Sequence, residues 1–556
     1  MRIVLLSTPT RVYTPNYIVP TGIISIAAYL EQCGHEVRVV DAAALRESNE
    51  SIVRRVAEFE PHVIGIGGII TAYAYIIPLT HDLKKALPKT PIVLGGQVSI
   101  NNDQNCFRHM AIDYIVHGYG EIGMEKLIRH FQGELALEAI PGISYLDKGA
   151  IVTNPGREFF KNIDEMPLPA YHLIDMEHYA TVNGHRHAKL HKYLEKNGKT
   201  AKNHRFCTVM GTLGCTDRCT FCVHEQEYVG LKVFSNDYVL RHIRLLHETY
   251  DINVLAIGEE MFITKLTRAR EFNNLMKEHF PDIYWSASTR ADFITPEMVA
   301  ELETGNCFFL SYGFESGSKK MLDLMKKRMT REQNILAYTL CDTGKLVGSC
   351  SLMVGNVGET HETVKETISA VREAHIGRAT CFFASPYPGG RTWDWAVERG
   401  LIKDTHEYLI AASDKDAGAR INLNLTPHPD WILKGWQQMV MWECEKQEWK
   451  KEHQLYSGQA FFLKWRKYLR PLLGYTYIPT PIMRCLVELY FLYYRTTRKF
   501  FKTKKDRQFE YKLDKKGSLL PDRLIVSKPQ THLSPEQLSD LVSQPRVRIP
   551  IHAVRG

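Results

Sequence analysis

The chain has 556 residues, of which 44% are hydrophobic, 10% aromatic and 24% charged, and this composition excludes a disordered or fibrous protein. Of its 12 cysteines only three are clustered, which excludes a disulfide framework, and no secretory signal opens the sequence, so we expect a protein of the reducing cytoplasm. The net charge of +8 is concentrated near the end, where residues 464–516 hold 15 Lys and Arg against 4 Asp and Glu. At about 100–200 residues per domain, the length predicts three or so units.

Residues 1–140 alternate short β-branched runs with segments of helical spacing. The runs that we predict as strands cover residues 2–7, 36–41, 63–68, 91–96 and 113–118. This alternation predicts a five-stranded, doubly wound parallel sheet of the Rossmann-like kind. Such sheets bind ligands beyond the carboxyl ends of their strands.

Small and polar residues follow three of these predicted strands. They are Gly67, Gly68 and Thr71, then Gly95, Gly96 and Gln97, then Gly118, Tyr119 and Gly120. Glycines let a broad ligand approach the backbone, although any one of them is explained as well by a turn. The repetition at three strand ends favours a binding site. Because no G-x-G-x-x-G opens the first helix, a nicotinamide dinucleotide is a weak candidate.

A C-x3-C-x2-C motif stands at Cys215, Cys219 and Cys222. Three thiolates on one tight loop can each hold one iron of a four-iron four-sulfur cluster and leave the fourth iron open for a small chelating ligand. The alternative is a structural zinc site, in which His224 completes a Cys₃His set. The zinc interpretation explains only this loop, whereas the cluster interpretation also fits the residues that follow.

Residues 205–425 again alternate strands and helices. The predicted strands are FCTVMG (206–211), NVLAIGEE (253–260), IYWSASTR (283–290), CFFLSYGFES (307–316), LVGSCSLMVG (346–355) and TCFFAS (380–385). Six β/α units predict a partial (β/α)6 TIM-like barrel. In such barrels, functional residues lie at the carboxyl ends of the strands.

Polar residues and glycines close four of these six strands in order. They are Gly258, Glu259 and Glu260; Ser288 and Arg290; Glu315 and Ser316; and Gly355, followed by Gly358. A guanidinium such as that of Arg290 suits a carboxylate, because it offers two parallel donors. A surface ion pair or a turn explains each position alone, but the ordered series indicates one site.

Residues 1 to about 425 resemble the cobalamin-binding-domain-containing radical S-adenosylmethionine (radical SAM) enzymes. The resemblance rests on the segments CTDRCTFC, GEE, STR, FES and GNVGE. It implies that S-adenosylmethionine occupies the open iron and is cleaved reductively to a 5′-deoxyadenosyl radical. It also implies a set of contacts to this cosubstrate: Phe221 and Gly355 to the adenine, Gly258, Glu259 and Glu260 to the amino group, Ser288 and Arg290 to the carboxylate, and Glu315 and Ser316 to the ribose. The family often has proline where Val357 stands.

The same resemblance implies that residues 1–140 are a cobalamin-binding domain. The residues that it implies for cobalamin binding are Thr71, Gly95–Gln97 and Gly118–Gly120, whose motifs are only weakly specific. The D-x-H-x-x-G loop of other cobalamin proteins is missing, which implies base-off cobalamin without a histidine ligand from that motif. In the loop after the sixth barrel strand, Tyr387 either faces the substrate or packs within the loop, and both interpretations stay open.

The implied reaction is methylation of an unactivated carbon of a hydrophobic or polycyclic small molecule, with electrons from a reductase such as flavodoxin or ferredoxin. Radical cyclisation or ring rearrangement is the alternative within the family. An alternative of another class is a non-catalytic protein that binds zinc and nucleic acid. Metal analysis discriminates between these classes, since one zinc and no iron favours the non-catalytic protein.

Two segments lie outside these domains. Residues 141–204 read as a linker, and residues 426–556 as a mostly helical, basic region. Within the linker, residues 184–204 are polar, basic and rich in histidine, which favours a solvated connector over a metal site. Basic and aromatic residues over 460–516 suit either peripheral contact with an anionic membrane or helices that cap the barrel, whereas nucleic acid is unlikely without a recognisable RNA-binding module. Pro479, Pro481, Arg484 and Glu488 interrupt any transmembrane span there.

Overall fold

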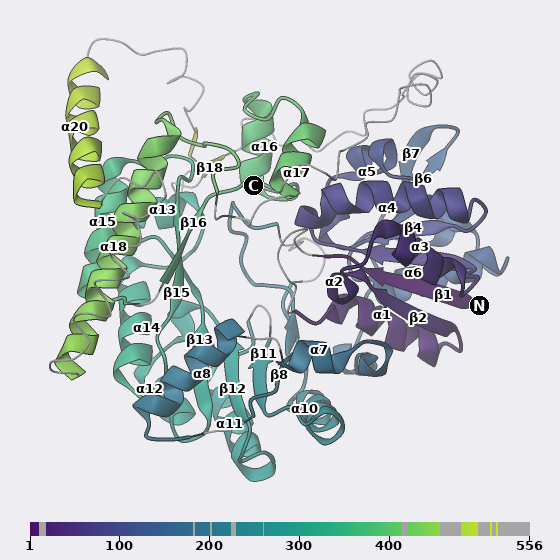
Figure 1. The fold of residues 1–556 in the computed structure, drawn as a ribbon, viewed down its shortest axis with the longest axis horizontal. Coiled ribbons are helices and arrows are strands. Elements are labelled where there is room, and N and C mark those ends of the chain that lie inside the picture. The colour runs from purple at the N-terminus through teal and green to yellow at the C-terminus, as the bar shows by residue number, and fades with distance from the viewer. Residues whose placement is uncertain are drawn as a thin grey trace.

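The computed structural model describes most of the chain. It describes residues 1–9, 18–181, 184–200, 203–223, 230–258, 261–377, 379–413, 418, 420–455, 480–498, 512–513 and 519–520. Two α/β units lie side by side, the first at one end in purple and blue and the second in teal and green (Figure 1). Two long helices, α18 and α20, stand at the end remote from the first unit.

The first unit is built on a seven-stranded sheet with the order β2-β1-β3-β4-β5-β6-β7. Its strands are β1 (Arg2–Ser7), β2 (Glu36–Asp41), β3 (Val63–Gly67), β4 (Ile92–Gly95), β5 (Tyr114–Val116), β6 (Ile143–Asp147) and β7 (Ala150–Thr153). The first five are parallel, as the sequence predicts. The apolar run of β1 is buried along its length, as expected for a central strand covered on both faces.

Helices connect these strands and cover both faces of the sheet. They are α1 (Thr21–Gln32), α2 (Ala42–Leu45), α3 (Asn49–Ala57), α4 (Tyr73–Ala86), α5 (Asp103–His109) and α6 (Gly120–Phe131). Capping fixes some of their ends: Ser48 accepts from the Ser51 amide at the start of α3. The doubly wound fold is therefore confirmed.

The segment expected to be a linker is largely structured. Its first part forms the β6–β7 hairpin, which pairs antiparallel with β5 and extends the sheet. Two helices follow, α7 (Met176–Thr181) and α8 (Gly184–Lys196). In α8, Leu190, Tyr193 and Leu194 are buried at helical spacing and pack against the barrel, so this stretch is not simply a solvated connector.

The second unit is a partial barrel whose parallel strands form two sheets. Two short consecutive strands, over residues 307–311 and 313–315, take the place of the fourth predicted strand. One sheet has the order β13-β12-β11-β8 and the other β14-β15-β16. The strands are β8 (Phe206–Val209), β11 (Val254–Ile257), β12 (Tyr284–Ser288), β13 (Cys307–Ser311), β14 (Gly313–Glu315), β15 (Cys350–Val354) and β16 (Ala379–Phe383), with a small antiparallel pair, β9 (Thr212–Leu213) and β10 (Lys232–Val233). The barrel that the sequence predicts is therefore confirmed.

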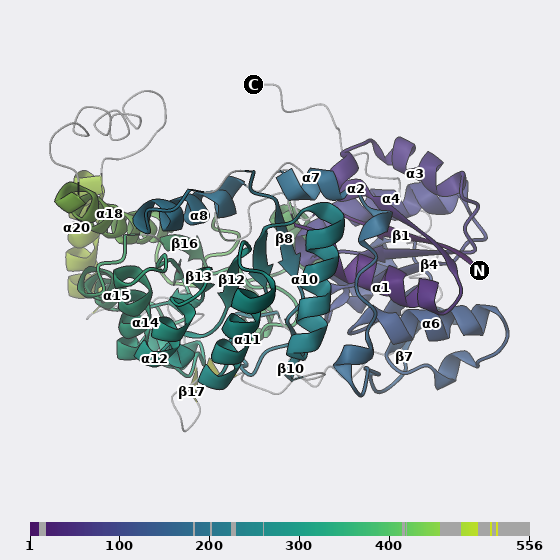
Figure 2. The same ribbon diagram turned by 90° about the horizontal axis from the view of Figure 1, so that it is seen from below.

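Helices line the outside of the barrel, as the view from below shows (Figure 2). They are α10 (Asn236–Tyr250), α11 (Leu266–His279), α12 (Pro296–Leu302), α13 (Lys319–Leu324), α14 (Arg331–Thr343) and α15 (His361–Glu373). Residues after β16 form α16 (Arg391–Glu398) and α17 (Thr405–Ser413), which turn back to the first unit. There Tyr73 of α4 hydrogen-bonds His406 of α17 at 2.9 Å.

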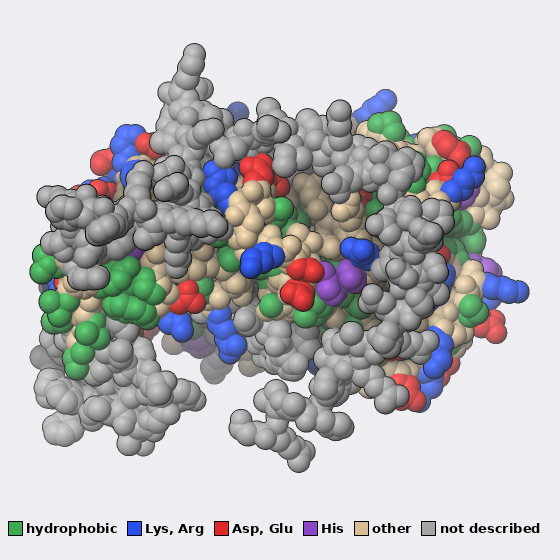
Figure 3. All heavy atoms as spheres, turned by 90° about the horizontal axis from the view of Figure 1, so that it is seen from above, with side chains coloured by type: hydrophobic (Ala, Val, Ile, Leu, Met, Phe, Trp, Pro, Cys, Tyr) green, Lys and Arg blue, Asp and Glu red, His purple; other side chains and the backbone are tan. Residues whose placement is uncertain are grey.

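The C-terminal region contains α18 (Asp430–Leu455) and α20 (Thr480–Arg498). Helix α18 packs against α15 and β16, and α20 packs against α18. Exposed aliphatic side chains gather at this end of the molecule, among them Ile482, Leu486, Leu489 and Leu492 of α20 (Figure 3). Within the described residues no helix is both long and apolar enough to cross a membrane. Two short strands, β17 (Lys512–Leu513) and β18 (Leu519–Leu520), pair antiparallel with each other.

Candidate active site

A cavity of about 450 Å³ lies between the carboxyl edge of the first sheet and the cysteine loop. The first sheet contributes residues at the ends of β1, β3, β4 and β5, and the barrel side contributes Met210, Thr212, Leu213, Gly214 and Val223. Because Gly214 precedes Cys215 and Val223 follows Cys222, the cavity reaches the cysteine motif. Most of its remaining wall is aliphatic.

Six of the seven residues predicted for the first domain's ligand line this cavity. They are Gly95, Gly96, Gln97, Gly118, Tyr119 and Gly120. Thr71 is buried in the short 3-10 helix Ile70–Ala72, which precedes α4, and is not among the lining residues. The structure therefore brings the glycine-rich ends of β4 and β5 together at this cavity. Gly67 and Gly68, at the end of β3, line it as well.

Gly68 and Gly96, which follow β3 and β4, leave no room for side chains. Gly96 has a φ of +83°, and a Cβ there would stand 2.7 Å from the carbonyl oxygen of Gly68. A Cβ on Gly68 would stand 2.7 Å from the hydroxyl of Thr8. The backbone itself therefore forms this wall, and a flat ligand can lie directly against it.

The three cysteines of the motif are half-buried on one loop. The amide of Cys222 donates to the carbonyl of Cys219 at 3.1 Å, and Cys215 Sγ lies 3.8 Å from Met261 Sδ. Burial raises the pKa of the Cys219 thiol to about 12, against the opposing effect of the Lys327 ammonium. A metal or a cation must therefore accompany the thiolate form of Cys219.

Neighbouring side chains hold the cysteine loop in place. The carboxylate of Asp217, only 1% exposed, pairs with the guanidinium groups of Arg290 and Arg328. Arg328 also donates to the carbonyl of Thr216 at 2.8 Å. On the other side of the loop, the carbonyl of Thr220 accepts from both the amide and the hydroxyl of Thr392 in α16. The loop is thus fixed from β12, from the turn after α13 and from α16.

The guanidinium of Arg290 has more protein partners than the sequence predicts. Besides Asp217, its guanidinium donates to the carboxylate of Asp292 at 2.9 and 3.1 Å and to the carbonyl of Lys327 at 3.2 Å. Two protein carboxylates therefore already compensate its charge. The sequence flagged Arg290 for a ligand carboxylate and did not flag Asp217, whose burial is visible only in the folded chain.

A buried ion pair adjoins the cysteines. Lys327 Nζ lies 3.2 Å from a carboxylate oxygen of Glu315 and 6.0 Å from the centroid of the Phe221 ring. Both charged side chains are about nine-tenths buried, and Glu315 adopts a φ of +58°, which is unusual for a residue with a side chain. Lys327 is a site residue that sequence reasoning missed, since it stands in a run of lysines, arginine and methionine without a motif.

Close packing and hydrogen bonds shape three strand ends, those of β11, β12 and β14. Gly258 has a φ of +70°, and a Cβ there would stand 2.7 Å from the Cβ of Phe262. The carbonyl of Ser288 accepts from the Phe262 amide at 2.9 Å, and the hydroxyl of Ser316 bonds that of Thr367 at 3.0 Å. Ser316 thus fastens its strand end to α15. The predicted acidic residues Glu259 and Glu260 lie outside the described residues.

The GNVGET loop is organised by a buried carboxyl. Glu359 accepts hydrogen bonds from the backbone amides of Gly355 and Asn356, and burial raises its pKa to about 8. Gly355 has a φ of +83°. Val357, which stands where proline is common, is buried in the cluster shared with the first unit.

The loop around Tyr387 joins the cysteine motif to the first unit. A Cβ on Gly389 would stand 2.6 Å from Ile100 of the first unit, and one on Gly390 would stand 3.3 Å from the carbonyl oxygen of Cys222. Tyr387 itself is half-buried and packs against the cluster shared by the two units. Contact between Tyr387 and a substrate stays a prediction.

No three His, Cys, Asp or Glu side chains among the described residues are arranged to hold a single metal ion. His224, the fourth ligand of the zinc alternative, lies outside the described residues. A cubane cluster takes each thiolate on a different iron, so its ligands do not converge on one point.

Two family models match the chain. The model described as B12 binding domain matches residues 9–128, and the model described as Radical SAM superfamily matches residues 209–371. These matches coincide with the sheet that borders the cavity and with the barrel that carries the cysteine motif.

Similar proteins match about 70% of the chain. An uncharacterized methyltransferase of Pyrococcus horikoshii is 26% identical over 72% of this chain and 84% of its own length. The anaerobic magnesium-protoporphyrin IX monomethyl ester cyclase of Rubrivivax gelatinosus is 22% identical over 70% of this chain and 68% of its own. Among solved structures, the radical S-adenosylmethionine methyltransferase TsrM of Kitasatospora setae superposes with a TM-score of 0.58 at 17% identity, over 72% of this chain and 77% of that one.

Proposed function

The chain belongs to the cobalamin-dependent radical SAM enzymes, and on this basis we propose that it methylates an unactivated carbon of an apolar small molecule. Its cofactors are a four-iron four-sulfur cluster, S-adenosylmethionine and cobalamin. When bound, the cluster supplies the electron that cleaves S-adenosylmethionine, and cobalamin supplies a carrier for the methyl group. The observation that carries the proposal is the aliphatic cavity running from the glycine-rich sheet edge to the cysteine motif.

The residues present fit the cluster. Cys215, Cys219 and Cys222 share one loop that Asp217 and Thr220 anchor on three sides. Iron ligation compensates the cost of ionising the buried Cys219 thiol, which is otherwise strongly disfavoured. The protein's own task here is to keep the loop rigid and partly shielded from water.

The residues also fit cobalamin. Gly68 and Gly96 form a cradle in which a Cβ has no room, so the broad face of a corrin ring can rest against the backbone. We propose that the cofactor is bound base-off, because the sequence from residue 8 to residue 22, after β1, contains no histidine to ligate cobalt from below.

For S-adenosylmethionine, the cations beside the cysteines allow two assignments. Arg290 is the residue that the motif order favours, but its charge is compensated by Asp217 and Asp292. Lys327 has three donors and pairs with Glu315 alone among carboxylates of the described residues. We therefore propose Lys327 as the partner of the cosubstrate carboxylate, with Arg290 positioning the loop.

The other contacts to S-adenosylmethionine are also proposals. Phe221 and Gly355 border the adenine, Glu315 accepts from the ribose hydroxyls, Gly258 to Glu260 receive the amino group, and Ser288 and Ser316 shape the strand ends. A neutral, lipid-like or polycyclic substrate is proposed from the apolar and basic C-terminal region, and not from the aliphatic cavity wall, which is assigned to cobalamin. A flavodoxin or ferredoxin type of reductase supplies electrons. Peripheral membrane contact through 460–516 is supported by the exposed aliphatic side chains of α20.

A second reaction within the same family is radical ring closure. The matches to anaerobic magnesium-protoporphyrin IX monomethyl ester cyclases of three organisms support it, because they cover 61% to 70% of the chain. The site's described residues are compatible with either outcome, since both begin with the same hydrogen abstraction. The non-catalytic zinc and nucleic-acid alternative lacks this support.

The test is anaerobic reconstitution of the full chain with iron, sulfide and cobalamin, followed by addition of reductant and S-adenosylmethionine. We expect about four irons and one cobalt per chain and release of 5′-deoxyadenosine. Changing all three motif cysteines to alanine should abolish both iron binding and release. Mass spectrometry of product then separates methylation, which adds one CH₂, from cyclisation, which does not. A wild-type protein that holds iron but never releases 5′-deoxyadenosine contradicts the proposal.

A further inference from the structure

One carboxyl group stands on the wall of the large cavity. Glu121, only 4% exposed, lies in the first turn of α6 and borders both this cavity and a small adjoining one behind Phe160. Among the described residues that line the large cavity, Glu121 is the only carboxyl group, and these residues include no Lys, Arg or His. A charge at this position therefore has no opposite charge on the cavity wall.

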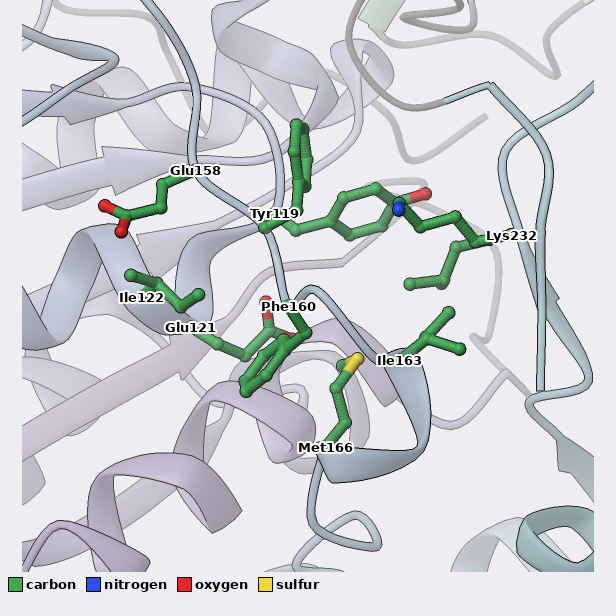
Figure 4. Close-up of a pocket in the computed structure, with 10 residues that line it drawn as sticks. Tyr119, Glu121, Ile122, Glu158, Phe160, Ile163, Met166 and Lys232 are labelled. Carbon is green, nitrogen blue, oxygen red and sulfur yellow. The ribbon is translucent and has the colours of Figure 1, made fainter. Parts of the chain in front are cut away.

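The surroundings of Glu121 favour its neutral form. Burial raises its pKa to about 7, and its own backbone amide is the hydrogen-bond donor that opposes the shift. Figure 4 shows the carboxyl on the side of Phe160 and Met166, whereas Lys232 extends toward Tyr119. At neutral pH a large fraction of the protein therefore carries a protonated Glu121.

Other titratable side chains lie around Glu121. Burial raises the pKa of Tyr238 of α10, so this phenol stays neutral. Tyr119, which precedes α6, and Lys232 of β10 border the small cavity. Glu158, which also borders the small cavity, is paired with Lys126 at 2.6 Å.

A protonated carboxyl offers an O–H donor and a carbonyl acceptor side by side. This pattern complements a primary carboxamide, which presents an N–H donor and a carbonyl acceptor in the same way. The rim of a corrin ring carries primary carboxamides. We propose that Glu121, in its protonated form, binds a rim carboxamide of the corrinoid cofactor through two hydrogen bonds.

This proposal rests on cobalamin being the ligand of the cavity, and it predicts a pH dependence of cofactor affinity. Only the acid form makes both hydrogen bonds, so affinity is highest below about pH 7 and falls by up to roughly tenfold per pH unit above it. Glu121→Gln presents the same donor and acceptor without a titrating proton. Glu121→Leu presents neither.

The experiment measures binding of cyanocobalamin to cobalamin-free full-length protein by equilibrium dialysis with absorbance detection, from about pH 6 to about pH 9. We expect the wild-type Kd to rise with pH, the Glu121→Gln Kd to stay flat, and the Glu121→Leu Kd to be about tenfold higher at the acid end. Glu125→Gln, one turn further along α6 and beside Arg129, is the matched control and should behave as wild type.

The outcomes separate this proposal from the cofactor assignment. If the wild type binds no corrinoid at any pH, the cofactor assignment fails and the role of Glu121 fails with it. If the wild type binds but its affinity does not change with pH, or Glu121→Gln follows the wild-type profile, the role of Glu121 alone is refuted. Circular dichroism of each variant checks folding, and Glu121→Gln keeps the test decisive should Glu121→Leu unfold.

Discussion

Two cations stand beside the cysteine loop and differ in what already compensates them. Arg290 contacts two carboxylates, whereas Lys327 contacts one. We expect Lys327→Met to raise the Kd for S-adenosylmethionine about ten- to hundredfold, as loss of a charged hydrogen bond costs about 1.5–3 kcal/mol. Equilibrium dialysis with the reconstituted protein measures it.

The control for this prediction is Lys319→Met, because Lys319 is exposed on α13 and pairs there with Asp323, away from the cysteine loop. It should leave the affinity unchanged. Arg290→Gln should instead lower the iron content, since it removes an anchor of Asp217. If the Arg290→Gln protein kept its full iron content but bound S-adenosylmethionine more weakly, Arg290 and not Lys327 would be the partner of the cosubstrate carboxylate.

Glu359 makes stability depend on pH. Its pKa is about 8 in the folded chain and 4.5 for an ordinary glutamate, so the fold favours its protonated form. The stabilisation is complete below about pH 4.5 and is lost as the pH rises toward 8. We expect Glu359→Gln, which keeps the carbonyl acceptor for Gly355 and Asn356, to flatten this part of the profile by up to a few kcal/mol.

Urea unfolding at closely spaced pH values measures the free energy of unfolding for the wild type and the variant. Glu332→Gln is the control, because Glu332 is fully exposed in the first turn of α14 and its pKa is lowered rather than raised. Identical wild-type and Glu359→Gln profiles would contradict the prediction.

Single residues were predictable from the sequence where a motif marks them. The cysteines and the glycines of the cavity wall follow from spacing and from their place at strand ends. Asp217 and Lys327 were not predictable, since their importance comes from burial and from partners over a hundred and about a dozen residues away respectively. Glu121 follows the Gly118–Gly120 segment, but nothing in the sequence reveals that its carboxyl lacks a countercharge on the cavity wall.

At the scale of elements, the turn from β4 into α5 depends on a glycine that is constrained twice. Gly96 combines a φ of +83° with contact to the carbonyl of Gly68. Gly96→Ala should therefore destabilise by more than the roughly 1 kcal/mol of a left-handed alanine and should displace the cavity wall. We expect lower corrinoid content as well as a lower free energy of unfolding.

Gly34 is the matched control, because it shares the positive φ of Gly96 without the close contact to another backbone segment. Its φ is +85°, but a Cβ there would meet nothing within 4 Å. Gly34→Ala should show the backbone cost without loss of corrinoid. If both variants lose equal stability and retain equal corrinoid, close backbone contact at Gly96 is not what shapes the wall.

Most elements could be predicted because their apolar period is regular. The sequence also contains signals for two elements that we did not predict. The β6–β7 hairpin turns through Lys148 and Gly149, both at positive φ, and a glycine two-residue turn between alternating runs is a hairpin signal. Helix α8 reads as polar, yet its three apolar residues share one face, and the barrel covers that face.

At the scale of the whole molecule, the two units share one buried cluster, and this could not be predicted. Residues of the first sheet and α4 pack with Val357, Trp395 and Leu409, which come from loops and helices after the barrel's fifth strand. Periodicity locates elements along the chain but does not reveal which faces meet. The cavity owes its position to this contact, because the Tyr387 loop packs between Ile100 and Cys222.

The shared cluster predicts that a substitution far from any cofactor weakens cofactor binding. Leu409 of α17 is 0% exposed, whereas Leu336 of α14 is 47% exposed. Leu409→Ala should lower the free energy of unfolding by about 2–5 kcal/mol and raise the Kd for cyanocobalamin, because the cavity it leaves loosens the joint beside the cysteine loop. Leu336→Ala should change neither by a comparable amount. Urea unfolding and dialysis on the same preparations measure both quantities. If Leu409→Ala lost the stability while corrinoid affinity stayed unchanged, the cluster would hold the two units together without shaping the cavity between them.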